Sequence, residues 1–418
     1  MIQRPRGTRD ILPPDTRLWN RVEAVAREGF SAWGAEEIRT PAFEHTELFV
    51  RSVGETTDIV HKEMYTFLDR KERSLTLRPE GTAGVARAWI ENRMQDRSLP
   101  LRLYYIGPMF RYERMQRGRY RQFAQIGLEI IGAETPLADA ELLAALHEFL
   151  VRLGFDDVEI HLNNLGDPDD RQRYQEAIRE VMEVHRAELC GDCQRRLDEN
   201  PLRLLDCKVP RCQELSAEAP AMDAVASPAS REHVAGVEAH LAHLGVPYRR
   251  NPRLVRGLDY YLRTAFEVVS PKLGAGTALG GGGRYDRLIA DLGGPAVPGV
   301  GFAIGEDRLI DVLPEAFRLE TLARPRLYLV PLGEAAQAWA LELARDWVRG
   351  GVPVELEVIG RSARAAFKRA DRDHFPVVVL VGDDELAQGT VTVKRLADGS
   401  QTQLTPERVP GWWLEHVR

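Results

Sequence analysis

The sequence predicts an α+β core built on an antiparallel sheet, with a helical insertion, followed by a C-terminal α/β domain with a mostly parallel sheet. Three observations support this fold class. Up to about residue 320, runs of strands and runs of helices succeed one another, which is typical of antiparallel sheets that carry helices. Within that part, about 168–245 is mostly helical in pattern. After about residue 325, helices alternate with short apolar strands, which implies crossover connections and parallel strands.

The elements of the core follow from start, stop and turn signals. Pro13-Pro14-Asp15 precede apolar residues at helical spacing, and Gly34 follows as a stop. Thr82 is a hydroxyl residue suited to cap the helix that follows it. The polar, glycine-containing run 114–119 separates two apolar stretches and predicts a long hairpin. In order, the predicted elements are a helix ending at Trp33, a strand at 37–40, a helix from Thr82 to about Met94, strands at 101–111 and 120–131, a helix at 136–153 and a strand at 260–269.

The predictions for the rest of the chain depend on a glycine run and on alternation. Four consecutive glycines, 280–283, are expected to form a tight turn, and a helix follows Arg284. The segment 315–324 is expected to be a boundary, so the predicted domains are 1–320 and 325–418. The elements of the second domain, in order, are a strand at 327–331, a helix at 334–348, a strand at 352–358, a helix at 361–370, a strand at 377–381 and a hairpin of 391–396 with 401–404.

The composition of the 418-residue chain excludes several classes of protein. Hydrophobic residues make up 44% and charged residues 28%, which is ordinary for a globular protein and not for a disordered or collagen-like one. No apolar stretch approaches the ~18 residues of a membrane span. The first ten residues contain three arginines and no apolar run, so they do not resemble a secretory signal. We expect a cytoplasmic protein with no membrane partner.

Most of the basic residues are arginines, and arginines cluster in one segment of the sequence. The net charge is −7, and only six of the 56 basic residues are lysines. A GC-rich genome would account for most of this excess, but 101–125 holds six arginines against one acid, Glu113. Arginine binds phosphates and carboxylates through two parallel hydrogen bonds. The cluster therefore predicts an anionic ligand at one site and not a nucleic-acid coat over the whole surface.

The strongest motif lies in this cluster, on the two strands of the predicted hairpin. Because side chains on a strand alternate, Arg111 and Glu113 share one face, and Arg121 and Phe123 share one face across the hairpin. A fixed arginine can neutralise a phosphate, a carboxylate can accept an amine hydrogen, and an aromatic ring can stack on a base. The alternative is a surface hairpin with cross-strand ion pairs.

Four further runs are weak singly but specific as a set: 76–82, 254–261, 279–286 and 299–308. In this order, with the hairpin motif, they resemble the histidyl-tRNA synthetases, a subgroup of the class II aminoacyl-tRNA synthetases. The resemblance extends from Arg6-Gly7-Thr8-Arg9-Asp10 to the C-terminal domain. The runs 254–261 and 280–286 are similar to the two signatures peculiar to the histidine enzymes, so they narrow the resemblance from class II to histidine.

The resemblance implies a two-step ligation of L-histidine to tRNA(His). The histidine carboxylate attacks the α-phosphorus of ATP, pyrophosphate leaves, and the terminal ribose hydroxyl of the tRNA then attacks the adenylate. It also implies Mg²⁺ on the ATP phosphates, a homodimer formed through the helix and strand that end at Pro41, and a C-terminal anticodon-binding domain. Because the first nucleophile is already an anion, positioning and charge stabilisation suffice without a general base.

The resemblance also implies a role for each matching residue. Three arginines are implied to be catalytic: Arg111 and Arg256 flank the α-phosphate, and Arg308 lies against the ATP. ATP contacts are Arg111, Glu113 at the adenine amino group, Arg121, Phe123 stacked on the ring, and Arg308. Histidine contacts are Glu80, Gly81, Thr82, Arg111, Gln125, Glu129, Arg256, Tyr260 and Tyr261. Of these, Glu80, Thr82 and Gln125 accept from the ammonium group, and Glu129 and Tyr261 pair with the imidazole. The tRNA acceptor end is expected at Arg114, Gln116 and Arg117.

Two features stand apart from the family pattern. Asp307 occupies a position where the family would lead us to expect a glutamate, so the geometry there is open. All the cysteines lie at Cys190-x2-Cys193 and Cys207-x4-Cys212, a spacing that suits a tetrahedral structural zinc site. Disulfides are not expected in a cytoplasmic protein. The alternative to zinc is four ordinary buried cysteines, because the family does not need zinc for activation.

One alternative function is a non-catalytic paralogue. Regulatory subunits of histidine biosynthesis resemble the catalytic half of these synthetases, but they typically lack the C-terminal domain and erode the histidine signatures. This chain carries both, which favours the enzyme.

Overall fold

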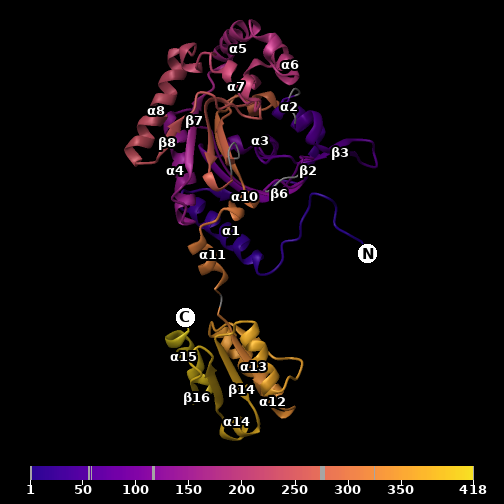
Figure 1. The fold of residues 1–418 in the computed structure, drawn as a ribbon, viewed down its shortest axis with the longest axis vertical. Helices are drawn as coiled ribbons and strands as arrows, with labels where there is room; N and C mark the ends of the chain where they lie inside the picture. Colours follow the sequence, from indigo (N-terminus) through magenta and orange to yellow (C-terminus); the bar gives the residue numbers. More distant parts are fainter. Residues whose placement is uncertain are drawn as a thin grey trace. The chain divides into compact units, whose positions relative to one another are not determined.

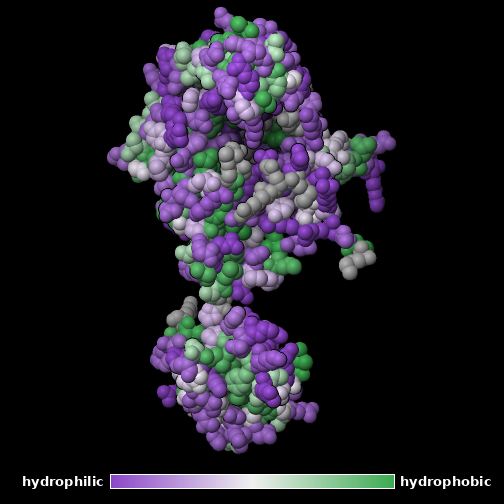
Figure 2. Space-filling view, in the orientation of Figure 1, coloured by the Kyte–Doolittle hydropathy of each residue, from purple (hydrophilic) through white to green (hydrophobic). Residues whose placement is uncertain are grey.

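The structure is a computed structural model that describes residues 2–54, 57, 59–114, 118–273, 278–323 and 325–417. The chain forms two compact units, Met1–Thr321 and Leu322–Arg418 (Figure 1). No helix in the described ranges is long and apolar enough to cross a membrane. The face drawn in Figure 2 is mostly hydrophilic, with hydrophobic residues in groups among the hydrophilic ones.

An eight-stranded sheet forms the centre of the first unit, in the order β1-β5-β6-β11-β10-β9-β7-β8. All neighbours from β5 to β7 in this order are antiparallel, which confirms the predicted antiparallel sheet. The edge strands β1 and β8 pair in parallel with their neighbours. The bounds are β1 Glu36–Glu37, β5 Leu101–Phe110, β6 Gln122–Ile131, β7 Glu159–Asn164, β8 Tyr248–Arg250, β9 Leu262–Val269, β10 Ala278–Arg284 and β11 Gly299–Gly305.

The four consecutive glycines form a strand and not the expected turn. They lie in β10, between β9 and β11, and their neighbours approach the backbone closely. A Cβ atom at Gly280 would lie 2.2 Å from the Ala303 carbonyl oxygen, and one at Gly282 would lie 2.0 Å from the Gly301 carbonyl oxygen. Glycine is therefore required here by close packing between strands and not by turn geometry.

Helices cover both faces of this sheet. On one face lie α1 (Asp15–Ala32), α4 (Pro136–Arg152) and α8 (Pro228–Leu244). Phe30 of α1 joins them to the sheet, because its ring centroid lies 5.4 Å from that of Phe149 and 5.9 Å from that of Phe302. On the other face, α3 (Thr82–Glu91) and α9 (Leu288–Asp291) pack against the sheet around the buried Trp89.

The start of α3 differs from the prediction that Thr82 caps it. Both carboxylate oxygens of Glu80 accept backbone hydrogen bonds, from the amides of Thr82 (2.7 Å) and Ala83 (2.8 Å). Glu80 thus satisfies two of the free amides at the helix start. The Thr82 hydroxyl is left to donate elsewhere.

Two smaller parts complete the first unit. Between β7 and β8 the chain is helical, and α5, α6 and α7 gather at one end of the unit (Figure 1). Before α3, a three-stranded sheet in the order β2-β4-β3 forms, which sequence reasoning missed. The bounds are α5 Pro168–Glu183, α6 Gly191–Glu199, α7 Pro210–Ser216, α2 Thr46–Val53, β2 Phe43–His45, β3 Tyr65–Leu68, β4 Ser74–Leu77, α10 Glu306–Asp311 and α11 Glu315–Leu322.

The second unit is a five-stranded sheet in the order β13-β12-β14-β15-β16 with helices packed on it. The sheet is mixed and not mostly parallel. Strands β13, β12 and β14 pair in parallel, whereas β14, β15 and β16 pair antiparallel, and a short hairpin joins the last two. The bounds are β12 Leu327–Pro331, α12 Ala335–Arg349, β13 Val354–Leu356, α13 Ala363–Arg372, β14 Val377–Val381, α14 Asp383–Gln388, β15 Val391–Arg395, β16 Gln401–Leu404 and α15 Val409–His416.

Candidate functional site

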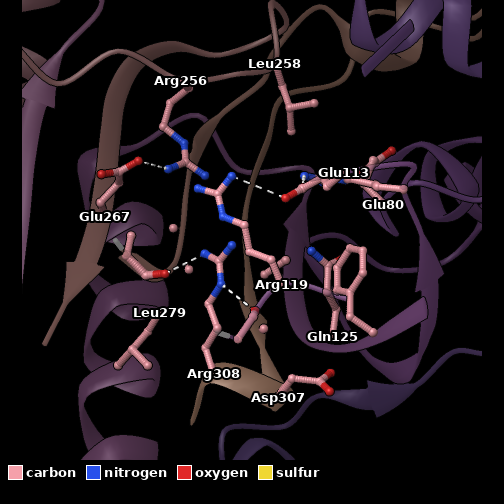
Figure 3. A pocket seen from close by; sticks show the side chains of 18 of the residues that line it. Glu80, Glu113, Arg119, Gln125, Arg256, Leu258, Glu267, Leu279, Asp307 and Arg308 are labelled. Carbon is pink, nitrogen blue, oxygen red and sulfur yellow. Dashed lines mark hydrogen bonds and ion pairs between the residues drawn. The ribbon is translucent and has the colours of Figure 1, made fainter. Parts of the chain in front are cut away.

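A pocket in the first unit gathers most of the residues that the sequence motifs single out. Its walls are the β5–β6 hairpin, strands β9 to β11, the segment 256–261 and the start of α10. Figure 3 shows the side chains of Arg119, Arg256 and Arg308 extending into the same space. The lining therefore combines residues as far apart in the chain as Glu80 and Arg308, and the antiparallel sheet brings them together.

One end of the pocket is rich in arginine. Arg256 is paired with Glu267 at 2.6 Å, and Arg119 lies 3.3 Å from a carboxylate oxygen of Glu113 (Figure 3). Burial, followed by the positive charge of Arg119, lowers the pKa of Arg308. Arginines this close repel one another, so an anion bound between them would be stabilised.

Backbone carbonyls hold these arginines in place. Arg308 donates to the carbonyl of Ala278 at 2.7 Å, and Arg111 donates to the carbonyl of Pro79 at 2.8 Å. A Cβ atom at Gly281 would lie 2.7 Å from a terminal nitrogen of Arg256, so glycine at this position makes room for that guanidinium. The guanidinium groups are therefore oriented before any ligand arrives.

The other end of the pocket contains carboxylates, an amide and tyrosines. Glu80, Thr82, Gln125, Tyr260 and Tyr261 lie on the wall, and all five are buried. Burial raises the pKa of Glu80 and of both tyrosines, which favours their neutral forms. This end therefore offers hydrogen-bonding groups without a fixed positive charge.

Glu129 lies behind this wall and is fully buried. One of its carboxylate oxygens accepts from the Thr82 hydroxyl at 2.7 Å, and the other accepts from the Tyr285 hydroxyl at 2.6 Å. Burial raises the pKa of Glu129 to about 8. A Cβ atom at Gly301 would lie 1.6 Å from Glu129, so the glycine on the adjacent strand accommodates this carboxyl group.

Four polar atoms of residues that line the pocket are buried and have no partner among the described residues. They are the side-chain oxygen of Gln125, the hydroxyl of Tyr260 and the Nε atoms of Arg119 and Arg256. Unsatisfied polar groups are rare in folded proteins and are costly. Together with the arginines, they indicate a pocket whose hydrogen bonds are completed by a polar, partly anionic ligand.

Comparison with known proteins decides the family. A family model described as histidyl-tRNA synthetase matches residues 7–309, and one described as anticodon binding domain matches 326–416. The chain belongs to the histidyl-tRNA synthetase family. The histidine–tRNA ligase of Bacillus cytotoxicus is 48% identical over 407 residues, which is 96% of each chain. That of a Cyanothece species is 50% identical and covers 97% of this chain and 94% of its own.

Solved structures agree with this assignment. The crystal structure of apo histidyl-tRNA synthetase from S. aureus matches with a TM-score of 0.81 and 37% identity, over 99% of both chains. A Bacillus halodurans structure titled as an ATP phosphoribosyltransferase regulatory subunit/histidyl-tRNA synthetase matches with a TM-score of 0.64. At 23% identity over 91% of this chain and 98% of its own, that match supports the fold alone.

Most residues that the family resemblance singled out do line the pocket: Glu80, Thr82, Arg111, Glu113, Phe123, Gln125, Arg256, Tyr260, Tyr261 and Arg308. Three others do not. Gly81 packs against the Tyr105 ring, Glu129 lies behind Thr82, and the Arg121 guanidinium lies 3.6 Å from the centroid of the Tyr112 ring. Arg121 and Glu129 therefore do not contact the pocket directly in this arrangement, and Gly81 serves close packing.

The residues expected at the tRNA acceptor end are Arg114, Gln116 and Arg117. Arg114 is exposed and does not line the pocket. Gln116 and Arg117 lie outside the described residues. Their contacts with tRNA stay predictions.

Asp307, where the family would lead us to expect the longer glutamate, makes two hydrogen-bonded contacts. Asp307 accepts from the guanidinium of Arg9 at 2.7 Å and from the backbone amide of Ala124 at 2.8 Å. It thus ties the N-terminal segment and β6 to the start of α10, next to Arg308. Aspartate is long enough for both contacts.

Sequence reasoning missed three polar residues of the site, Arg119, Glu267 and Tyr285. Arg119 lies in the arginine cluster, and Tyr285 lies in one of the motif runs, so a signal existed for each. Glu267 carries no local signal, because its partner Arg256 is eleven positions away and reaches it only through the fold of β9.

Proposed function

We propose that this chain ligates L-histidine to tRNA(His) in two steps, forming histidyl-adenylate from ATP and then transferring the histidyl group to the 3′-terminal ribose. The observation that carries the proposal is that one pocket joins an arginine-rich end to a buried carboxylate, amide and tyrosine end. The first end suits the phosphates of ATP, and the second suits the ammonium and imidazole groups of histidine. We place the reaction in the cytoplasm, where tRNA is charged.

At the phosphate end, the proposed roles follow from the chemistry of the first step. As the carboxylate attacks the α-phosphorus, negative charge grows on the phosphate oxygens, and Arg111 and Arg256 stabilise it from fixed positions. Arg308 holds the rest of the triphosphate, supported by Arg119. Because each guanidinium already has one partner in the protein, little reorganisation is needed as the transition state forms.

The adenine ring is proposed to lie between β6 and the arginines. Phe123 offers a ring face for stacking, and its centroid lies 5.5 Å from the Arg111 guanidinium carbon. Glu113 lies nearby, 3.7 Å from Arg111, and accepts a hydrogen bond from the adenine amino group. Both residues belong to the hairpin: Phe123 lies in β6, and Glu113 lies three residues after the end of β5.

At the histidine end, Glu80 and Gln125 face the ammonium group, and Tyr260 and Tyr261 face the imidazole. The Gln125 oxygen has no partner among the described residues, which leaves it to accept from the substrate. Glu129 acts behind them by orienting the hydroxyls of Thr82 and Tyr285. A pocket of this kind rejects amino acids that leave its polar groups unpaired, so we expect no editing activity.

Mg²⁺ bound to ATP would neutralise charge on the phosphates during the first step. The pocket fits such an ion, because the carboxylate of Glu267 supplies a hard oxygen donor beside the arginines. Glu267 would hold it, directly or through water. The ion arrives with the nucleotide.

A homodimer is also proposed, through the region around β1 and the small three-stranded sheet. Phe43, Phe67 and Leu68 of that sheet are 51%, 44% and 66% exposed. The Phe43 and Phe67 rings pack edge to face on each other, with centroids 6.4 Å apart. Exposed aromatic clusters of this type mark protein interfaces, and a second copy of the chain is the occupant that the family resemblance implies.

The tRNA is proposed to bind both units. In the second unit, α13 carries the exposed side chains of Arg364 and Lys368, which suit phosphate contacts. Nearby arginines are already engaged, because Arg361 pairs with Glu357 and Arg369 with Glu355. Arg364 and Lys368, which make no ion pair with the described residues, are therefore the better candidates for the anticodon stem.

The function is tested by histidine-dependent ATP–pyrophosphate exchange, followed by aminoacylation of tRNA from a plausible host with histidine and with the other amino acids. We expect exchange with histidine alone and charging of tRNA(His). Folded protein that shows no exchange with histidine and Mg²⁺ present would instead favour the regulatory paralogue.

A further inference from the structure

The four cysteines of the chain meet in the helical insertion, away from the pocket. Their Sγ atoms all lie within 4.8 Å of one another, and those of Cys190 and Cys207 are 3.9 Å apart. A disulfide requires about 2.05 Å between sulfurs, so these cysteines are free thiols. A tetrahedral zinc ion with bonds of about 2.3 Å places its sulfur ligands about 3.8 Å apart, close to the observed spacing.

Two of the sulfurs accept hydrogen bonds from backbone amides. The backbone amide of Cys190 donates to the Cys212 sulfur at 3.3 Å, and the amide of Val209 donates to the Cys207 sulfur at 3.5 Å. Cys190 also immediately precedes α6, and Cys193 lies in its first turn, so the start of one helix carries two of the four sulfurs. Amide donors of this kind support and orient metal-bound ligands.

We propose that the insertion holds one structural zinc ion, bound by Cys190, Cys193, Cys207 and Cys212. Three of these cysteines are buried and the fourth is half-buried. Four protein ligands leave no open coordination position, so the ion has a structural and not a catalytic role. The site does not depend on the proposed function.

The insertion needs such a support because its own core is small. Three of the four cysteines belong to a cluster of buried residues that runs only from Tyr174 to Ala226. The helices that carry two of the ligands have 9 and 7 residues. Segments of this size bury little apolar surface, and metals commonly supply the missing stability.

The same core supports the segment that carries Arg256. Val255 packs against the cysteine-containing cluster, and Arg253 donates to the Ser216 hydroxyl at 2.5 Å. From the insertion, Arg203 donates to the carbonyl of Gly257 at 3.1 Å. Zinc therefore fixes the backbone on both sides of Arg256, and its loss loosens one wall of the pocket.

Metal content tests the site directly. The untagged full-length protein is purified without chelator, because a polyhistidine tag binds zinc, and its zinc content is measured by mass spectrometry. We expect about one zinc ion per chain. A content below about 0.3 per chain would overturn the proposal, as would a disulfide between two of the cysteines in protein isolated under reducing conditions.

Matched variants separate metal binding from folding. Cys193→Ser and Cys212→Ser should lose most of the zinc, whereas Leu215→Ala, which removes bulk from the same core, should keep it. Cobalt exchanged into the wild-type chain should show cobalt–thiolate charge-transfer absorption, a readout that does not require a variant to fold. Zinc retained in both serine variants, or cobalt bound without that absorption, would contradict the four-cysteine site.

Hydrogen exchange tests the link to the pocket. After zinc is removed from the wild-type protein with a chelator, amide exchange should speed up in 251–259 and in α6 and α7, and stay unchanged in the β5–β6 hairpin. Adding zinc alone should restore protection. Unchanged exchange in 251–259 would show that zinc does not support the segment that carries Arg256. Whether the zinc site exists would then be decided by the metal content alone.

Discussion

Two arginine–carboxylate pairs each have one residue on the large sheet, and they differ in how many of their hydrogen-bonding atoms have a partner. Arg284 and Asp139 are both 0% exposed. Arg284 also donates to the carbonyl of Ala133 at 3.0 Å, and Asp139 accepts from His233 at 2.8 Å. Burial alone would raise the pKa of Asp139, but the hydrogen bond from His233 and the charge of Arg284 lower it.

The pair of Arg256 with Glu267 is incomplete by comparison. Its side chains are 16% and 32% exposed, and the Arg256 Nε is buried with no partner among the described residues. A buried pair whose donors are all used stabilises the fold, whereas a pair with an unused donor beside a cavity is ready for a ligand. The contrast separates structural from functional arginines without any appeal to sequence motifs.

The largest expected effect is a loss of adenylation rate when the pair of Arg256 with Glu267 is broken. Arg256→His removes a fixed cation at the transferred phosphate, and we expect histidine-dependent pyrophosphate exchange to fall by about 10³- to 10⁴-fold. Histidine binding, measured by calorimetry, should persist, and the urea midpoint should move little. Near-normal exchange would show that Arg256 does not act at the phosphate.

Breaking the complete pair should give the opposite result. Arg284→Met leaves Asp139 buried with only His233, which should cost about 3 to 5 kcal/mol of unfolding free energy in urea titrations. The exchange rate per folded active site, counted by active-site titration, should stay near that of the wild type. The double variant Arg284→Met/Asp139→Leu removes both charges and should recover part of the stability. A double variant no more stable than the single one would contradict this account.

Glu129 sharpens the comparison, because it is a buried carboxyl group with two donors and no cation. Its pKa is raised from 4.5 to about 8, so the folded state keeps a proton that the unfolded state releases above pH 4.5. Unfolding free energy should therefore fall as pH rises from about 4.5 to 8, by at most about 1.4 kcal/mol per pH unit. Glu129→Gln should flatten this slope in urea titrations at several pH values. An unchanged slope would mean that other groups cause it.

Structural features that neighbouring residues determine could be predicted from the sequence, whereas features that distant residues determine could not. The β5–β6 hairpin and its arginines follow from alternation and charge along one stretch, and the antiparallel sheet follows from the order of elements. The glycines 280–283 were misread as a turn because the reason for them is the backbone of two neighbouring strands. Likewise, Glu80 and not Thr82 caps α3, because the Glu80 side chain, which precedes the helix, accepts from the first two helix amides.

The positions of Glu129 and Glu267 show the same limit within the site. Both were beyond local reasoning. Glu129 contacts Thr82 and Tyr285, which are far away in the sequence, and Glu267 contacts Arg256, which the fold brings back to β9. Family resemblance supplied Glu129 as a histidine contact, but the register of β6 against β11 puts it behind the pocket wall. Residue type and motif thus indicated the chemistry of the site, and strand register decided which atoms face the cavity.

The smallest expected effect concerns α13, where the contrast between engaged and free cations recurs. Arg361 and Arg369 are paired with glutamates, whereas the exposed Arg364 and Lys368 make no ion pair with the described residues. Because a phosphate contact contributes modestly and is screened by salt, we expect Arg364→Glu or Lys368→Glu to raise the KM for tRNA several-fold and to lower the salt dependence of tRNA binding by about one unit of slope.

Pyrophosphate exchange, which needs no tRNA, should be unchanged in both variants. The matched control is Arg345→Glu on α12, which changes the charge of the same unit equally at a residue already paired with Asp346. If the control raises the KM for tRNA as much as the two α13 variants do, the effect comes from net charge. A larger effect at Arg364 and Lys368 than at Arg345 would instead assign the phosphate contact to the free cations of α13, in keeping with the rule that unused donors mark the binding surface.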